Sequence, residues 1–207
     1  MTIAVLDGGT YYHRETIHGD RYRGWFDRVI YAPDLTVADL DGIDTLIVPD
    51  RLSPTLLRRH RDLLNAFPAA AGRTLVVMGE NDVPSWLDGA AWSPRPTNFW
   101  WWLDQGAVPP HQFPAPDHPL FRHIRPADAI WHFHGVLQPP PGATVLVAVP
   151  ADAEGRDGGG ALLYEDRVTR PGRLIVATLD PFYHHGSRFM PATTRFLDGF
   201  LPWLKGG

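Results

Sequence analysis

Residues 44–78, DTLIVPDRLSPTLLRRHRDLLNAFPAAAGRTLVVM, decide the fold class because two apolar runs flank an amphipathic helix pattern. The helix pattern covers 53–67, with Ser53 as the predicted N-cap and Pro54 as the first helical residue. Its leucines fall on one stripe and its arginines opposite. The flanking runs are apolar on both faces, which is typical of parallel strands covered on both sides. This stretch therefore predicts a βαβ unit in an α/β protein.

The same reading extends to the rest of the chain. Short strands are predicted at 2–6 and 28–32, with a polar, aromatic loop at 10–24. Later strand-like runs and a closing helix are separated by turns rich in Pro and Gly, at 129–137, 143–150, 160–168, 172–180 and 191–204. We predict one domain over 1–207, with an irregular Trp- and Pro-rich insertion at about 83–128.

Composition excludes several classes of function. The chain has 207 residues, 44% of them hydrophobic, and a formal net charge of -4, so we expect no nucleic-acid partner. It has no cysteine, which excludes disulfides, thiolate metal sites and cysteine nucleophiles. No stretch approaches the roughly 20 apolar residues of a membrane span, and no basic leader is present. We expect a cytoplasmic protein with no membrane partner and no cofactor.

Glu80 and Asn81 follow the apolar run at 74–78 directly. Side chains at the carboxyl end of a parallel strand face the crevice in which such sheets bind ligands. Glu80 is therefore a candidate general base or ligand anchor, and Asn81 a candidate ligand contact. The structural alternative is that Glu80 caps the following turn or pairs with an arginine.

Histidines form two close pairs. His132 and His134 alternate along the predicted strand 129–137, so both are expected on one face. His184 and His185 follow the strand that ends at Asp180, in a loop predicted to include Tyr183 and Arg188. The two pairs could meet and hold a divalent metal with Asp180 or Glu80, although no metal-binding motif is present. We therefore assign no metal site and keep His184 and His185 as catalytic candidates. The candidate ligand contacts among these residues are His132, His134, Asp180, Tyr183 and Arg188.

Phe99, Trp100, Trp101 and Trp102 are consecutive, so they cannot all face one core. Indole rings stack on sugars, which makes Trp101 and Trp102 candidate walls of a ligand pocket. They also suit a contact between copies of the chain, or a loop folded over the sheet.

The order of these elements resembles the class I glutamine amidotransferase-like superfamily. The matching stretches are the first strand ending in Asp7-Gly8-Gly9, DTLIVPD before its helix, GRTLVVMGEN at 72–81, DHPLF at 117–121 and GRLIVATLDP at 172–181. The similarity covers most of the chain and is nearest to the trehalose-utilisation (ThuA-like) branch. It implies a flavodoxin-like three-layer sandwich with a mainly parallel central sheet.

The resemblance also implies where the site lies. Active amidotransferases carry a cysteine nucleophile after the central strand, and Glu80 or Asn81 stands near that position here. His118 matches the branch's His-Pro element, and Asp7 is expected beside the pocket. We expect a small polar ligand, a sugar or sugar derivative, with acid–base hydrolase or isomerase chemistry. One alternative is an interaction protein that forms homo-oligomers through the loop around residues 99–102, here called the Trp loop. The other is a His-ligated metal-dependent hydrolase.

Overall fold

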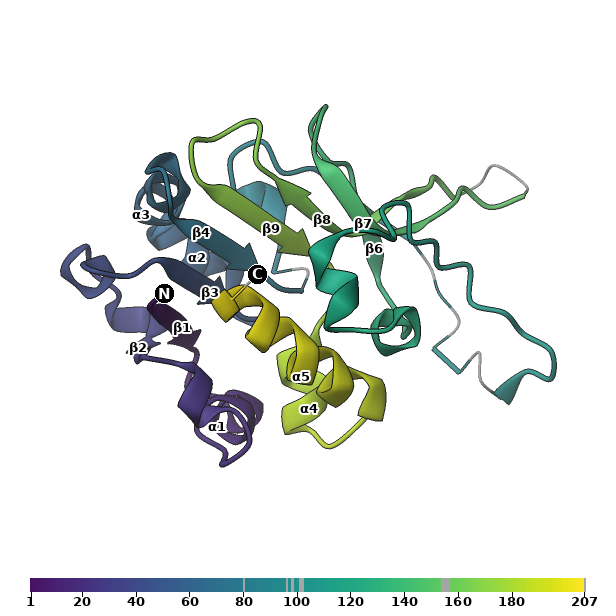
Figure 1. Ribbon diagram of the computed structural model, residues 1–207, viewed down its shortest axis with the longest axis horizontal. Coiled ribbons are helices and arrows are strands. Elements are labelled where there is room, and N and C mark those ends of the chain that lie inside the picture. The colour runs from purple at the N-terminus through teal and green to yellow at the C-terminus, as the bar shows by residue number, and fades with distance from the viewer. Residues whose placement is uncertain (80, 96, 98, 101–102, 154–156, 207) are drawn as a thin grey trace.

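The computed structural model describes residues 1–79, 81–95, 97, 99–100, 103–153 and 157–206 (Figure 1). Within these ranges, nine strands form one sheet in the order β2-β1-β3-β4-β9-β8-β6-β5, and β7 pairs with β8. The fold class predicted from the sequence is confirmed: a central, mostly parallel sheet is flanked by helices.

Five neighbouring strands make up the parallel part of the sheet. They are β1 (Ile3–Asp7), β2 (Arg28–Tyr31), β3 (Thr45–Val48), β4 (Thr74–Val77) and β9 (Arg173–Ala177). Within this group each strand pairs in parallel with its neighbours, so the five carboxyl ends lie along one edge of the sheet.

The other four strands extend the sheet in antiparallel fashion. They are β5 (Trp92–Pro94), β6 (Gly135–Leu137), β7 (Thr144–Val149) and β8 (Gly160–Asp166). Because β8 runs antiparallel to β9, its carboxyl end lies beside the amino ends of the parallel strands.

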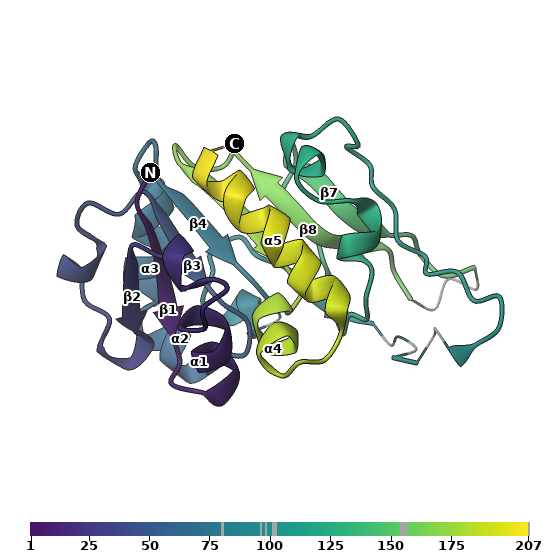
Figure 2. The same cartoon turned by 60° about the horizontal axis from the view of Figure 1, so that its bottom comes forward.

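Helices cover both faces of the sheet, as Figures 1 and 2 show. Helices α1 (Tyr11–Ile17), α4 (Pro181–Gly186) and α5 (Pro191–Gly206) lie on one face, and α2 (Pro54–Arg59) and α3 (Arg61–Ala66) lie on the other. Successive residues of each parallel strand point to opposite cores. Val5 packs with the first group of helices and Leu6 with the second, which explains why these strands are apolar on both faces.

Two segments predicted as loops are helices. In α1, the Thr10 side chain accepts a hydrogen bond from the His13 N–H, and His13, Thr16 and Ile17 are buried on one face. The helical spacing of those three residues was hidden by polar residue types. Helix α4 begins directly after Asp180, where Pro181 is well suited to the first helical position.

Two other predictions were wrong in extent. The single helix predicted over 53–67 is broken at His60, which separates α2 from α3. The φ of -99° and ψ of 12° of this residue lie outside the helical range. Of the segment 129–137, which was predicted as one strand, only the last three residues form a strand, β6. His132 and His134 therefore lie in irregular chain before it.

Short ordered elements lie among the described residues of the insertion. Besides β5, these include the 3-10 helices η5 (Val83–Ser85), η7 (Pro119–Arg122) and η8 (Pro126–Ala129), the last ending one residue beyond the predicted insertion. Among the helices of the described residues, none has the length and apolarity needed to cross a membrane.

Candidate functional site

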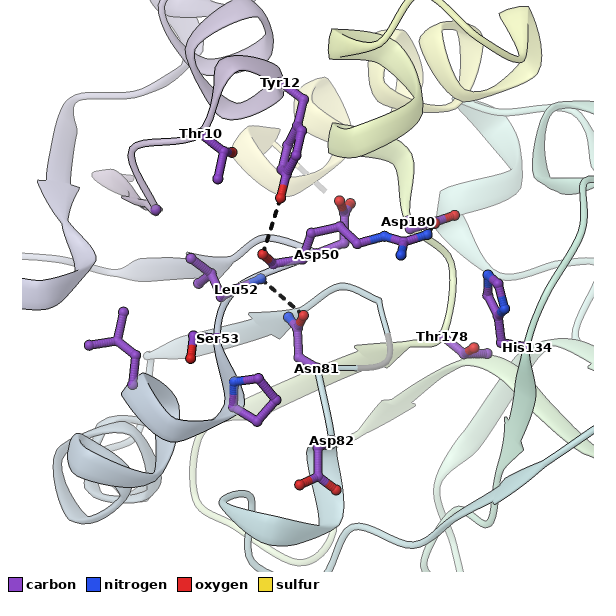
Figure 3. Close-up of a pocket in the computed structure, with 14 residues that line it drawn as sticks. Thr10, Tyr12, Asp50, Leu52, Ser53, Asn81, Asp82, His134, Thr178 and Asp180 are labelled. Atoms are coloured by element: carbon purple, nitrogen blue, oxygen red, sulfur yellow. Dashed lines mark hydrogen bonds and ion pairs between the residues drawn. The ribbon is translucent and has the colours of Figure 1, made fainter.

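A crevice of about 530 Å³ lies at the carboxyl edge of the parallel strands (Figure 3). Residues after β1, β3, β4 and β9 line it, together with one side chain of α1 and one from the chain before β6. The lining residues that carry polar side chains are Thr10, Tyr12, Asp50, Arg51, Ser53, Asn81, Asp82, His134, Thr178 and Asp180. This is the edge at which sheets of this kind bind ligands.

Asp50 joins the end of β3 to the start of α4. Its two carboxylate oxygens accept hydrogen bonds from the backbone N–H groups of Phe182 and Tyr183, both at 2.8 Å. The residue is fully buried. Burial, and then the neighbouring charge of Asp180, raise the pKa of Asp50 to about 8, although the two N–H donors favour its charged form. Asp50 therefore holds α4 against the edge of the sheet.

Arg51 and Asp180 form an ion pair at the crevice wall. The Arg51 guanidinium lies 2.9 Å from Oδ2 of Asp180 and 4.5 Å from the ring centre of Tyr183. Arg51 has a φ of 62°, a conformation that costs energy for a side chain of this size. The ion pair and the contact with Tyr183 hold the guanidinium, whose side chain is 42% exposed, where a ligand could reach it.

His132, Asp180 and His184 meet beside the crevice. The Nε2 atoms of the two histidines are 3.2 Å apart, and Nε2 of His184 is 3.2 Å from Oδ1 of Asp180. Burial lowers the pKa of His132 to about 4, so this imidazole is neutral near pH 7. Burial opposes the charge of Asp180, but the hydrogen bond with His184 and the Arg51 charge hold its pKa below the usual value.

Asn81 connects the chain after β4 to the chain after β3. Its side-chain Nδ2 donates to the carbonyls of Pro49 and Met78, and its Oδ1 accepts from the Leu52 N–H. The amide is 8% exposed, and both of its donors are used within the protein. Asn81 lines the crevice as predicted, but only the remaining lone pair of Oδ1 is available to a ligand.

The structure brings together six of the residues predicted from the sequence. Asn81, His132, His134, Asp180, Tyr183 and His184 lie in or directly beside the crevice. The rings of His132 and His134 are neighbours, with centres 5.4 Å apart, although they do not lie on a strand as expected.

Four predicted residues lie elsewhere. Asp7 bonds to His18 at 2.8 Å and lines a separate hollow beside α1. His185 points to Thr194 of α5, with Nδ1 and Oγ1 2.8 Å apart. Arg188 pairs with Glu15 at the surface, 3.3 Å away. His118 bonds to Glu165 of β8, at the opposite edge of the sheet.

Glu80, Trp101 and Trp102 lie outside the residues that the structure describes, so their predicted roles stay predictions. The described residues on either side of Glu80 are Gly79 and Asn81. Gly79 packs against Asp50, and Asn81 lines the crevice.

Asp50 and Arg51 line the crevice but were not among the residues predicted for the site. They follow β3 just as Glu80 and Asn81 follow β4, so the strand-end rule that selected Asn81 also applies to them. Tyr12 of α1 also lines the crevice. Its hydroxyl donates to the Arg51 carbonyl at 3.4 Å, which places it across the crevice from α2 (Figure 3).

Comparison with solved structures shows a similar fold over nearly the whole chain. A Thermoplasma acidophilum protein assigned as one component of GMP synthase has a TM-score of 0.58 at 14% identity, covering 99% of this chain and 94% of that one. The mmIFT52 N-terminal domain has a TM-score of 0.56 at 13% identity, covering 100% and 98%. A ThuA-like protein from Bacteroides uniformis has a TM-score of 0.49 at 10% identity, covering 98% and 91%.

At these identities the likeness concerns the fold. It confirms the flavodoxin-like α/β fold that the resemblance implied. No protein-family model matches the sequence, and no curated protein sequence matches it.

Proposed function

We propose that the crevice binds a small polar ligand, a sugar or sugar derivative, in an amidotransferase-like protein that lacks the cysteine nucleophile. The absence of cysteine from the whole sequence supports the second part, because glutamine hydrolysis through a thiolate needs that residue. Within the superfamily we place the chain nearest the ThuA-like branch, on the sequence stretches that carry the resemblance.

The observation that carries the proposal is the mixture of donors and acceptors on the crevice wall. Arg51 and the hydroxyl of Ser53 can donate, whereas Asp180 and Asp82 can only accept when charged. A sugar presents hydroxyl groups that both donate and accept, so this wall suits it better than an apolar or purely anionic ligand. The volume of about 530 Å³ fits a ligand of one or two sugar rings.

The same wall offers acid–base chemistry. Asp180 is held charged near neutral pH, and His184 lies between it and neutral His132, 3.2 Å from each. We propose Glu80 as the base or ligand anchor, since its neighbours in sequence line or support the crevice. Glu80→Gln should then abolish turnover of a substrate found by binding, while leaving the fold intact by circular dichroism.

A thermal-shift panel of monosaccharides, disaccharides and keto-sugars tests the binding. A ligand at about 100 times its Kd should stabilise the protein by about 2.7 kcal/mol, which raises Tm by roughly 5 to 11 °C for a domain of this size. Arg51→Met should abolish the shift. Arg59→Met, the same substitution at an exposed position of α2 away from the crevice, should leave it unchanged. No shift with any sugar would contradict the proposal.

A second candidate is an interaction protein that associates through the Trp loop. Exposed apolar side chains there favour it: Trp100 is 56% exposed and Leu103 is 71% exposed. We expect light scattering to report a concentration-dependent mass that Trp100→Ala reduces to the monomer value. A constant monomer mass in the unaltered protein would contradict this candidate.

A further inference from the structure

Three side chains of types that bind metals converge in a buried position beside the crevice. His132 comes from the chain before β6, Asp180 immediately precedes α4, and His184 is four residues further along that helix. They are 6%, 5% and 2% exposed. One nitrogen or oxygen atom from each lies within 4.8 Å of the other two.

Protonation alone does not satisfy this cluster. Nε2 of His184 is 3.2 Å from both Nε2 of His132 and Oδ1 of Asp180, and a neutral imidazole carries only one proton. If His184 carries it on Nε2, one hydrogen serves two acceptors. If His132 carries it on Nε2 instead, the lone pair of His184 faces the carboxylate.

The Nδ1 atoms do not relieve the conflict. Among the described residues, neither Nδ1 of His132 nor Nδ1 of His184 has a hydrogen-bond partner. A proton on Nδ1 is therefore a buried donor without an acceptor, which is unfavourable. A cation that takes the place of the shared proton also leaves the proton of each imidazole on Nδ1, but it allows both Nε2 atoms and the carboxylate to act together as electron-pair donors, and these metal–ligand bonds offset that cost.

The spacing fits a tetrahedral metal ion. Ligand atoms about 2.0 to 2.1 Å from a tetrahedral Zn²⁺ lie about 3.3 to 3.4 Å from one another. Two of the three separations, at 3.2 Å each, are close to this value. The third, between His132 and Asp180, lies within 4.8 Å, so these two side chains need to approach each other by up to about 1.5 Å to hold the ion. Arg51 holds the other oxygen of Asp180 at 2.9 Å, which orients the carboxylate as outer-shell partners do in metal sites.

We propose that His132, Asp180 and His184 bind one divalent transition-metal ion of the Zn²⁺ type. Two imidazoles and one carboxylate are ligands that Zn²⁺ accepts, and three protein ligands leave a fourth position open. Asp180 also lines the crevice, so the ion lies at its wall. The proposal does not depend on a sugar being the ligand of the crevice.

The structure also sets limits on the site. Of the two histidine pairs considered from the sequence, only His132 and His184 belong to the cluster, because His185 bonds to Thr194 instead. Because the Nδ1 atoms lack outer-shell acceptors among the described residues, we expect weaker binding than in fully supported zinc sites, by about 10- to 100-fold.

Calorimetric titration of the chelator-treated full chain with ZnCl₂ tests the proposal. We expect one equivalent to bind, with a rise in Tm of roughly 5 °C or more at 100 times the Kd. His132→Gln and His184→Gln should each weaken binding by at least about 100-fold. His185→Gln changes the next residue of the same helix and should bind normally.

Two results would overturn the proposal. One is no stoichiometric binding by the unaltered chain. The other is unchanged binding by both His132→Gln and His184→Gln, which would place the ion elsewhere. If those variants fail to fold, crystals of the unaltered chain grown with zinc decide the matter, through anomalous scattering at the zinc edge. A peak among the three side chains supports the site, and its absence refutes it.

Discussion

Gly79 is the position at which the packing of the strand ends can be tested most sharply. It has a φ of +73°, and a Cβ added there would lie 2.4 Å from Cβ of Asp50 and 3.0 Å from Cα of Asp50. Gly79→Ala therefore introduces two separate costs. The left-handed backbone costs about 1 to 2 kcal/mol for alanine, and overpacking against a buried neighbour adds about 1 to 3 kcal/mol.

Gly42 provides a matched control. Its φ is +72°, nearly the same, but an added Cβ meets nothing within 4 Å. Gly42→Ala should therefore cost only the backbone term of about 1 to 2 kcal/mol. The difference between the two variants isolates the contact with Asp50, and we expect Gly79→Ala to be less stable by about 1 to 3 kcal/mol.

Urea unfolding followed by circular dichroism and Trp fluorescence measures both free energies. The dependence of unfolding free energy on urea should stay the same in both variants, because neither changes the surface exposed on unfolding. Equal destabilisation by the two substitutions, within about 0.5 kcal/mol, would refute the close packing of the ends of β3 and β4. It would also remove the support that this packing gives to the crevice.

Three further predictions concern residues around the sheet. Asn81→Ala should lower the unfolding free energy by about 2 to 4 kcal/mol, because three side-chain hydrogen bonds are lost; urea unfolding with a cost below about 1 kcal/mol would contradict this. Burial lowers the pKa of His111 to about 4, so the unfolded chain binds its proton between pH 6.5 and 4 and the folded chain does not. The free energy of unfolding should therefore fall as the pH is lowered over that range, and His111→Phe should reduce this fall by up to about 3 kcal/mol. Urea unfolding of both proteins at pH 6.5 and at pH 4 measures the two falls, and equal falls in the unaltered protein and the variant would contradict the prediction. Glu165→Gln leaves Arg173, with a side chain 9% exposed, without its buried partner and should cost about 3 to 5 kcal/mol in urea unfolding. Since Glu165 lies at the other edge of the sheet, zinc binding by Glu165→Gln should be unchanged, and a weakened affinity would argue against that separation.

The parallel part of the fold could be predicted from the sequence because burial on both faces gives a strong local signal. The runs at 46–48, 75–78 and 174–177 are continuous and apolar. Helix α1 gave a weaker signal, because two of its three buried residues are His13 and Thr16, which are usually exposed. The break at His60 has no Pro or Gly to mark it.

The candidate site was predicted most directly where residues follow strands. Asn81 and Asp180 were identified in this way, and Asp50 could have been. The meeting of His132 with His184 depends on how the chain before β6 packs against α4, 52 residues away in sequence, and no local pattern encodes that contact. His118 shows the converse, since a motif match placed it near the site while its bond to Glu165 holds it at the opposite edge.

The position of a bound sugar tests the proposed function most directly. Crystals of the full chain should be soaked with the sugar that gives the largest thermal shift, and the electron density of the ligand located. We predict density in the crevice, within hydrogen-bond distance of Arg51 and Asp180. Density in another hollow, such as the one lined by Phe189 and Met190, or no ligand density at all, would contradict the assignment of this edge of the sheet as the functional site.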